Sequence, residues 1–270
     1  MQTKLTVIVD NIPQEPLHGE WGLSILAAHR GSSILIDAGA SGLFAENMRA
    51  LGLSIRDVDC AMLSHAHYDH ANGMVRFFQE NATAKFYLRE SAQENCYARY
   101  LIFRKYIGLS RHVLTDYKDR IVSGDYLLSD GAYLIGHKTP GLSQIGKRER
   151  MYQKTPRGLV PDDFSHEQSL VLETERGLLI VNCCSHGGVV NIIREVRETF
   201  PGKHVYGYIG GFHLFNKSDA EIRAVAQNIR ATGLEFVCTG HCTGQRAYDI
   251  LKQTLGNRLH HLHVGLEMTF

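Results

Sequence analysis

The sequence is poor in net charge, in proline and in long hydrophobic runs. Its 270 residues carry a formal charge of +1 and include only six prolines. Without a basic stripe, nucleic acid is not an expected partner. Without any run near the roughly 18 apolar residues of a membrane helix, no membrane partner is expected either. Residues 1–4 lead into a strand-like segment and not into a secretion signal, so we expect a cytoplasmic location.

The cysteines also lack the spacing of two familiar kinds of site. The chain has six cysteines, with no CxxC pair and no framework typical of a secreted disulfide-rich domain. This pattern excludes a zinc ribbon and agrees with a reducing compartment. No linker-like segment divides the chain, and its 44% hydrophobic content can bury a sizeable core. We therefore expect one domain that spans residues 1–270.

The densest chemical signal lies in residues 58–73, which contain His65, His67, Asp69 and His70. A strand-like apolar segment precedes these side chains and a helical pattern follows them. Alternate residues of an extended segment face the same side, so His65 and His67 can bind one cation together. Asp69 and His70 lie where the chain turns, and can bind a second cation about 3.5–4 Å from the first. The alternative is a solvated histidine cluster or a structural zinc site, but four ligand-type residues with this spacing favour a metal site. Whether the site is catalytic depends on ligands from elsewhere in the chain.

Histidines recur at the ends of later strand-like segments. Three such segments end in polar, glycine-containing loops that carry His186, His213 and His241. In layered α/β folds the loops at strand ends gather at one edge, where ligands bind. A centre of two metals needs about five or six protein ligands. These three histidines are therefore candidates for the positions that residues 65–70 leave open.

The motif His65-Ala66-His67-Tyr68-Asp69-His70 resembles the HxHxDH signature of the metallo-β-lactamase superfamily. The whole chain is similar to the subgroup typified by the dihydropterin aminobenzene-ribosyl phosphate synthase of methanopterin biosynthesis. Besides that motif, the matching segments in order are Asp37-Ala38-Gly39, Glu167-Gln168-Ser169-Leu170, Cys184-Ser185-His186, Gly210-Gly211-Phe212-His213-Leu214 and His241-Cys242-Thr243-Gly244. The resemblance implies an α/β (α+β) fold, a four-layer αβ/βα metallo-β-lactamase-like sandwich.

The resemblance also implies which residues hold the metals. Two divalent ions are expected, with Zn²⁺ favoured and Mn²⁺ or Fe²⁺ as alternatives. The implied ligands are His65, His67, Asp69, His70, His186 and His241.

Three further residues are expected to act beside these ligands, and Asp69 is expected to have a second role. Asp69 and His213 are the candidate catalytic residues: Asp69 can orient the nucleophile, and His213 is expected to face the substrate or to shuttle a proton. Asp37 is expected to support the metal loop from behind. Cys184 stands where the wider superfamily usually has a bridging aspartate. It is either a soft ligand or a buried neighbour, and we favour the neighbour because buried cysteines are usually inert.

Three other features leave alternatives open. A basic run from 147 to 157 is either a solvated surface loop or, as a group, a site for an anionic substrate, with Arg148 and Arg150 as the substrate-binding candidates. His137 is either a further ligand or a surface residue. Residues 11–22, which carry the only tryptophan, are either a lid or a surface excursion.

The remaining pattern alternates strands and helices. We expect strands at 4–10, 23–30, 33–38, 58–63, 84–89, 126–128, 132–136, 169–174, 177–183, 204–209, 235–238 and 259–268. We expect helices at 43–51, 91–106, 189–200, 218–232 and 245–255, and one more that begins near residue 73.

The sequence thus predicts a dinuclear metal-dependent enzyme that acts on a small, anionic metabolite, phosphorylated or diphosphorylated, as the resembled subgroup does. In a hydrolase the nucleophile would be metal-bound water with a pKa of roughly 7, and in a transferase the ions would hold a diphosphate leaving group. One alternative is a metal-dependent hydrolase of a phosphodiester, thioester or lactone. Another, of a different class, is a non-catalytic metal or ligand sensor on the same fold. A di-iron redox role is disfavoured, because the resembled iron sites usually carry a carboxylate where this chain has His67.

Overall fold

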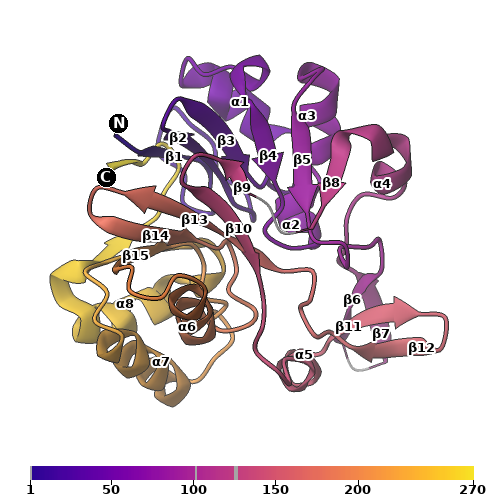
Figure 1. Ribbon diagram of the computed structural model, residues 1–270. Helices are drawn as coiled ribbons and strands as arrows, with labels where there is room; N and C mark the ends of the chain where they lie inside the picture. The colour runs from indigo at the N-terminus through magenta and orange to yellow at the C-terminus, as the bar shows by residue number, and fades with distance from the viewer. Residues whose placement is uncertain (1, 101, 125–126) are drawn as a thin grey trace.

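The computed structural model describes residues 2–100, 102–124 and 127–270. Two mixed sheets pack face to face, and helices cover the outer face of each sheet (Figure 1). The predicted four-layer αβ/βα sandwich is therefore confirmed. Both ends of the chain lie at the same side of the molecule (Figure 1).

The first sheet is built by the N-terminal half of the chain and one C-terminal strand. Four antiparallel strands continue into parallel ones, and helices α1 and α3 pack on the outer face. In order across the sheet the strands are β18 (Glu267–Thr269), β1 (Lys4–Val9), β2 (Ser24–His29), β3 (Ser32–Ile36), β4 (Cys60–Met62), β5 (Lys85–Leu88) and β8 (Ile121–Ser123). The helices of this half are α1 (Leu43–Ala50), α2 (Tyr68–Ala71), α3 (Met74–Glu80) and α4 (Val113–Asp116).

The second sheet has the same plan, with parallel strands on one side and antiparallel strands on the other. Its outer face packs against three helices. The strands are β17 (Leu259–His261), β16 (Phe236–Thr239), β15 (Val205–Ile209), β14 (Gly177–Val181), β13 (Gln168–Thr174), β10 (Ala132–Gly136) and β9 (Leu127–Ser129). The helices are α6 (Val189–Thr199), α7 (Asp219–Ala231) and α8 (Gln245–Leu255). Short 3-10 turns are η1 (Ile55–Asp57), η2 (Lys118–Arg120), η3 (His241–Thr243) and η4 (Gly256–Arg258).

Apolar side chains explain the layering. One buried cluster fills the space between the two sheets, and two others lie between each sheet and its helices. Strands that are covered on both faces need nearly continuous apolar sequence. β14 shows this pattern, because Leu178, Leu179, Ile180 and Val181 are all buried although they alternate between the two faces.

A small third sheet lies beside the sandwich (Figure 1). One of its hairpins replaces a helix that the sequence predicted. Its strands are β12 (Gly158–Pro161), β11 (Met151–Thr155), β6 (Cys96–Tyr100) and β7 (Phe103–Tyr106), with helix α5 (Ser143–Glu149) next to β11. The predicted helix at 91–106 is wrong, because this segment forms the β6–β7 hairpin. Its aromatic residues favour a strand, and pairing with the distant β11 satisfies the backbone, as at Tyr97 opposite Tyr152.

Two other predictions differ from the structure. The expected strand at 259–268 is two strands, because the chain crosses from the second sheet at β17 to the first at β18. The basic run starts in helix α5 and not in a loop; Arg150 ends that helix with a left-handed backbone, φ 58°. Residue 126 of the expected strand at 126–128 lies outside the described residues.

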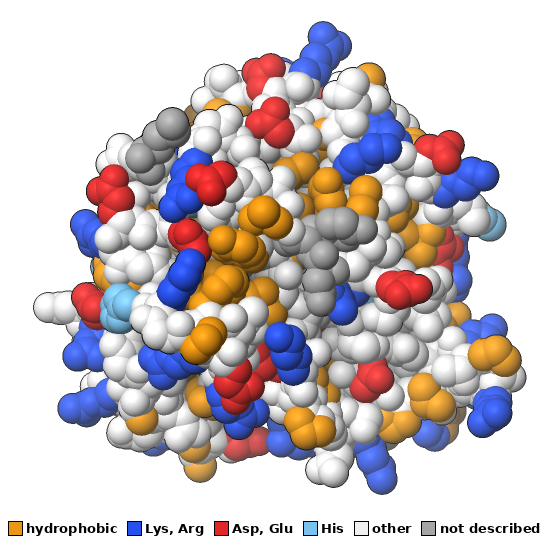
Figure 2. All heavy atoms as spheres, in the orientation of Figure 1, with side chains coloured by type: hydrophobic (Ala, Val, Ile, Leu, Met, Phe, Trp, Pro, Cys, Tyr) orange, Lys and Arg blue, Asp and Glu red, His pale blue; other side chains and the backbone are white. Residues whose placement is uncertain are grey.

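The surface carries charges of both signs. Basic and acidic side chains are interspersed over the face that Figure 2 shows. Among the described residues, no helix has both the length and the apolar composition needed to cross a membrane.

The parallel strands of both sheets end at one edge of the sandwich. The loops after β3, β4, β14, β15 and β16 carry Asp37, residues 65–70, His186, His213 and His241. Close backbone packing holds this edge together: Gly73, which precedes α3, lies so near the loop after β3 that an added Cβ would be 2.1 Å from the carbonyl oxygen of Ala38.

We expect Gly73→Ala to lower the free energy of unfolding by about 1–3 kcal/mol, because a methyl group has no room beside Ala38. Gly42→Ala is the matched control: neither glycine has a positive φ, and its added Cβ would meet only the Arg76 side chain at 3.8 Å. Urea unfolding of both variants measures the difference. Equal stability of the two would show that the edge does not depend on this contact.

Candidate metal centre

The ligand loop after β4 changes direction at His67. This residue has an extended backbone, φ −102° and ψ 149°, and precedes the short helix α2. His65 and His67 therefore lie on the extended part, and Asp69 and His70 on the helix. All four side chains are buried, with exposed fractions of 8% or less.

A first group of ligand atoms is formed by His65, His67 and His186. One ring nitrogen of each lies within 4.8 Å of the others, and the ring centres are 4.6–4.8 Å apart. Burial lowers the pKa of His67 to about 3 and those of His65 and His186 well below the usual value, so the rings are neutral. Neutral imidazole is the form that binds metals.

Several of these nitrogens have no hydrogen-bond partner within the described parts of the chain. They are Nε2 of His65, Nε2 of His67 and both ring nitrogens of His186. Buried polar atoms are nearly always paired. Three neutral, converging imidazoles with free nitrogens fit a divalent metal ion well.

A second group consists of Asp69, His70 and His241. Nε2 of His70 lies 3.1 Å from Nε2 of His241, and Oδ2 of Asp69 is 3.8 Å and 3.6 Å from these two atoms. Burial raises the pKa of Asp69, but the neighbouring imidazoles of His70 and His241 outweigh it and lower this pKa, so Asp69 is ionised. One carboxylate and two imidazoles are likewise a common ligand set for a divalent metal.

Asp37 supports both groups from behind. Its carboxylate accepts hydrogen bonds from the backbone N–H and the hydroxyl of Ser64, each 2.6 Å, and lies 2.7 Å from Nδ1 of His70. The Ser64 hydroxyl is also 2.9 Å from Nδ1 of His65. These contacts turn the Nε2 atoms of both rings toward the centre, as partners of ligand histidines commonly do. Asp37 thus contacts residues of the candidate metal loop, and its supporting role stays a prediction.

Residues 11–22 pack beside the second group. Asn11 binds Nδ1 of His241 through Oδ1 (3.1 Å), and the side chain of Asp10 accepts the backbone N–H of His241 (3.0 Å). The Trp21 ring is 5.2 Å from the His241 ring and 5.6 Å from Phe215. The segment therefore forms an anchored wall of the site. The roles of Asp10 and Asn11 were not predicted from the sequence, because only the fold brings them beside a residue about 230 positions away.

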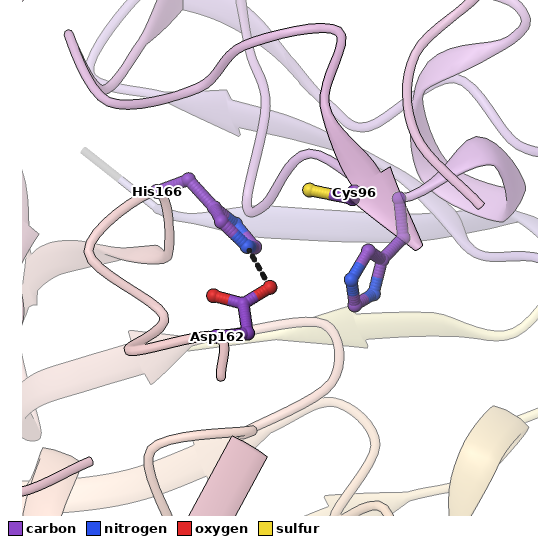
Figure 3. A group of neighbouring side chains, drawn as sticks. Cys96, Asp162 and His166 are labelled. Carbon is purple, nitrogen blue, oxygen red and sulfur yellow. Dashed lines mark hydrogen bonds and ion pairs between the residues drawn. The ribbon is translucent and has the colours of Figure 1, made fainter. Parts of the chain in front are cut away.

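The segment from 162 to 168 supports the first group, and this role was also not predicted from the sequence. Nδ1 of His166 accepts the backbone N–H of Ala66 (3.1 Å), and Nε2 of His166 donates to Asp162 (3.0 Å). Figure 3 shows this pair, with Cys96 beside it. These three residues and His67 form a fully buried group of ligand-type atoms within 4.8 Å. The hydrogen bond to Ala66 fixes the backbone between His65 and His67.

Two more residues of this segment hold the His186 loop. The Phe164 ring stacks on His186 at 4.9 Å and 8°. The carboxylate of Glu167 accepts the backbone N–H groups of His186 and Gly187, both at 2.8 Å. The signal that could have found Glu167 was its place just before the buried strand β13, where an acidic side chain needs a partner.

His137 lies behind the His186 loop and not among the ligands. Nδ1 is 2.9 Å from Glu195, and Nε2 binds Glu167. Burial lowers the pKa of His137, but Glu167 and Glu195 outweigh it and raise this pKa to about 9. With both ring nitrogens bound to carboxylates, His137 is a buried cation that supports Glu167.

Two cavities meet at the centre. The first, about 280 Å³, is lined by ligand residues together with Trp21, Tyr68, Tyr100, Lys105 and Phe215. The second, about 250 Å³, lies between α5 and α7 and is mostly apolar, with Arg148 and Lys217 on its wall. His186 and His213 line both cavities.

The structure also places the remaining candidate residues. The His213 ring lies 4.4 Å from that of His186, lines both cavities and buries an Nδ1 that has no partner among the described residues. Arg148 lines the second cavity, whereas Arg150 lines neither of these two cavities. The backbone oxygen of Arg150 instead accepts the N–H of Arg99 (2.9 Å). The roles of all these residues as ligands or in catalysis stay predictions.

The centre also concentrates backbone strain. Non-glycine residues with a positive φ are uncommon, and five of the eight in the described chain are Asp37, Phe164, Ser185, His213 and His241. Such strain typically persists where function requires a fixed geometry.

Comparisons with known proteins agree with this geometry. A family model described as the metallo-beta-lactamase superfamily matches residues 22–200. A 7,8-dihydropterin-6-methyl-4-(beta-D-ribofuranosyl)-aminobenzene-5'-phosphate synthase from Methanocaldococcus jannaschii is 26% identical over 271 residues, which cover 90% of each chain. An uncharacterized protein of the same organism, MJ0448, is 26% identical and covers 97% of this chain and 98% of its own. The crystal structure of Tm1679, a metal-dependent hydrolase of the beta-lactamase superfamily, is 28% identical, with a TM-score of 0.82 over 98% of both chains.

Removing the Asp37 carboxylate should weaken both the fold and the centre. We expect Asp37→Ala to lower the free energy of unfolding by about 3–5 kcal/mol, because Ser64 and His70 keep buried groups without a partner, and to weaken zinc binding about 10–100-fold. Asp59→Ala is the control, since Asp59 is exposed and accepts the Ser33 N–H (2.8 Å) away from the centre. Equal losses in both variants would contradict the supporting role of Asp37.

The buried cation at His137 predicts a pH dependence of stability. Because its pKa is raised from 6.5 to about 9 on folding, its contribution is complete below pH 6.5 and is lost as the pH rises through 9. At about 1.36 kcal/mol per pKa unit, the contribution is on the order of 3 kcal/mol. In chelator-treated protein, His137→Gln should therefore be clearly less stable than the wild type at pH 6, with a smaller difference at pH 10. A pH-independent difference in urea unfolding would contradict this assignment.

Proposed function

Because this chain belongs to the metallo-beta-lactamase superfamily, we propose that it is an enzyme with two divalent metal ions that acts on a phosphorylated or diphosphorylated small metabolite. One observation carries the proposal. Nitrogens of His65, His67 and His186 that have no partner among the described residues lie beside the group of Asp69, His70 and His241. Of the six residues, His67, Asp69 and His186 line one cavity.

The two groups divide the ligands between two ions. The first ion would bind to His65, His67 and His186. The second would bind to Asp69, His70 and His241. Such ions polarise a carbonyl or phosphoryl oxygen and lower the pKa of water. Imidazole with carboxylate suits zinc first, with manganese or iron(II) as alternatives.

The protein's own groups can orient an anionic substrate and transfer a proton. Lys105 lines the cavity in front of the ligands and can attract an anionic group. His213 lies on the same wall with a free Nδ1, so it can exchange a proton with a substrate oxygen. The name of the Methanocaldococcus relative includes a 5'-phosphate, which supports a phosphate-bearing substrate.

A second candidate is a metal-dependent hydrolase of a phosphodiester, thioester or lactone. Two observations favour it. The cavity between α5 and α7 is lined mainly by apolar side chains such as Ile145, Val189 and Leu214, which suit an acyl or other apolar group. The similar protein Tm1679 is described as a metal-dependent hydrolase.

Metal content tests the centre. We expect about two equivalents of zinc per chain in the wild type, and about one fewer in His67→Ala and in His241→Ala, because each variant removes a ligand from a different group. His204→Ala is the control, since His204 is exposed and pairs with Glu235 (2.9 Å) away from the centre. Plasma mass spectrometry of purified proteins gives these values. One equivalent or none, unaffected by His241→Ala, would favour a sensor.

Model substrates then separate the two enzymatic candidates. The zinc-loaded protein is assayed with para-nitrophenyl phosphate, a phosphate monoester, and with an aryl thioacetate. Preferential turnover of the phosphate supports the leading proposal, and preferential turnover of the thioester supports the second candidate. A protein that holds two metals but turns over neither probe, nor any phosphorylated metabolite in a wider screen, would contradict both.

A further inference from the structure

The β6–β7 hairpin presents three large apolar side chains to solvent. Ile102 is 84% exposed, Phe103 71% and Tyr100 60%. Tyr100 and Phe103 lie directly opposite each other at the end of the hairpin, and Ile102 lies in the turn between the two strands. Isolated exposed apolar residues are normal in soluble proteins, but adjacent ones indicate a surface that contacts a partner or a membrane. We call these three residues the hairpin tip.

Positive charge is concentrated on the small sheet that carries the hairpin tip. Residues 96–106 and 150–161, which include its four strands, contain six lysine and arginine residues and no acidic residue, although the formal charge of the whole chain is only +1. Arg99 and Arg104 lie opposite each other next to the tip, and both are exposed. The sequence does not show this concentration, because the two segments meet only through the pairing of β6 with β11.

The charge of this surface argues against a second copy of the chain as its partner. In a symmetric contact between two hairpin tips, Arg99 and Arg104 of both copies would lie close together and repel one another. A stable dimer also needs about 20–30 residues on each side, and the tip offers far fewer. β7 is an edge strand, but charged side chains such as Arg104 and Lys105 on an edge oppose pairing with another strand.

An anionic lipid surface matches both properties. Apolar and aromatic side chains enter the boundary between head groups and acyl chains, and lysine and arginine beside them attract acidic head groups. We propose that the hairpin tip, together with the basic residues next to it, docks the protein reversibly on an anionic lipid surface. The small sheet lies beside the sandwich and carries the tip at its end (Figure 1). This proposal replaces our expectation from the sequence that the protein has no membrane partner.

Docking would also bring the proposed metal centre close to the lipid. Tyr100 of the hairpin tip and Lys105 line the first cavity, together with the ligand candidates His67, Asp69 and His186. The tip and the centre are therefore parts of one continuous surface. The docking itself depends only on the hairpin and its charges, so it does not require a bound metal.

Vesicle co-sedimentation tests the proposal without an activity assay. The metal-free protein is mixed with vesicles of equimolar phosphatidylcholine and phosphatidylglycerol, and with vesicles of phosphatidylcholine alone. We expect binding at low salt that is about 10-fold or more weaker without phosphatidylglycerol, because the basic residues then have no acidic head groups. The double variant Ile102→Ser/Phe103→Ser should weaken binding about 10–100-fold by removing apolar area. Arg104→Glu should weaken it about 10-fold or more.

Two matched controls carry the same substitutions elsewhere. Leu127→Ser changes a side chain that is 62% exposed on β9 of another sheet, and Arg56→Glu changes an exposed cation on η1. Both controls should bind vesicles as the wild type does. No binding by the wild type, or equal losses in the controls and the hairpin variants, would overturn the proposal. A dimer in sedimentation equilibrium that Ile102→Ser/Phe103→Ser abolishes would assign the tip to self-association and would also overturn it. Because the assay uses metal-free protein, these outcomes leave the proposed metal centre untouched.

Discussion

The constraint behind this structure is the burial of imidazole nitrogens that have no hydrogen-bond partner. His65 and His67 each bury one such atom, and His186 buries two. An unpaired buried polar group costs about 1–3 kcal/mol. A divalent metal ion bound among these rings would remove part of this cost, because one nitrogen of each neutral imidazole would give its lone pair to the ion. Metal binding would then also stabilise the fold.

Free imidazoles stay in place only if other groups hold them. Each ligand loop has its own polar support: Asp37 behind His70, Asn11 behind His241, and Glu167 behind the His186 loop. These supports come from three separate segments of the chain. The loops also contain residues with positive φ, such as Asp37, His213 and His241, and each strained position costs about 1–3 kcal/mol. The surrounding sandwich must offset these costs, which explains why the ligands lie at the rim of two large, closely packed sheets and not on a free loop.

The local parts of this arrangement are visible in the sequence. Four times the chain runs from a buried strand through a polar loop into a helix, with β4, β14, β15 and β16 as the strands. Most of these elements follow from the periodicity of the sequence. The meeting of their histidines follows from the rule that loops at strand ends gather at one edge of a sheet. The roles of Asp10, Asn11 and His166 could not be predicted in this way, because their partners are brought close only by the fold. The β6–β7 hairpin was mistaken for a helix for the same reason: its strand pairing depends on β11, about 50 residues later.

The two ligand groups differ in charge, and this difference has a chemical consequence. His65, His67 and His186 are neutral, so an ion bound among them would keep its full charge, whereas the Asp69 carboxylate would reduce the charge of an ion bound to the second group. The first position would then be the stronger Lewis acid. His186 and His213 also line the apolar cavity. A substrate whose unreactive part fills this cavity would have its reacting part beside His186 and His213. Binding of the unreactive part would then help to orient the reacting part.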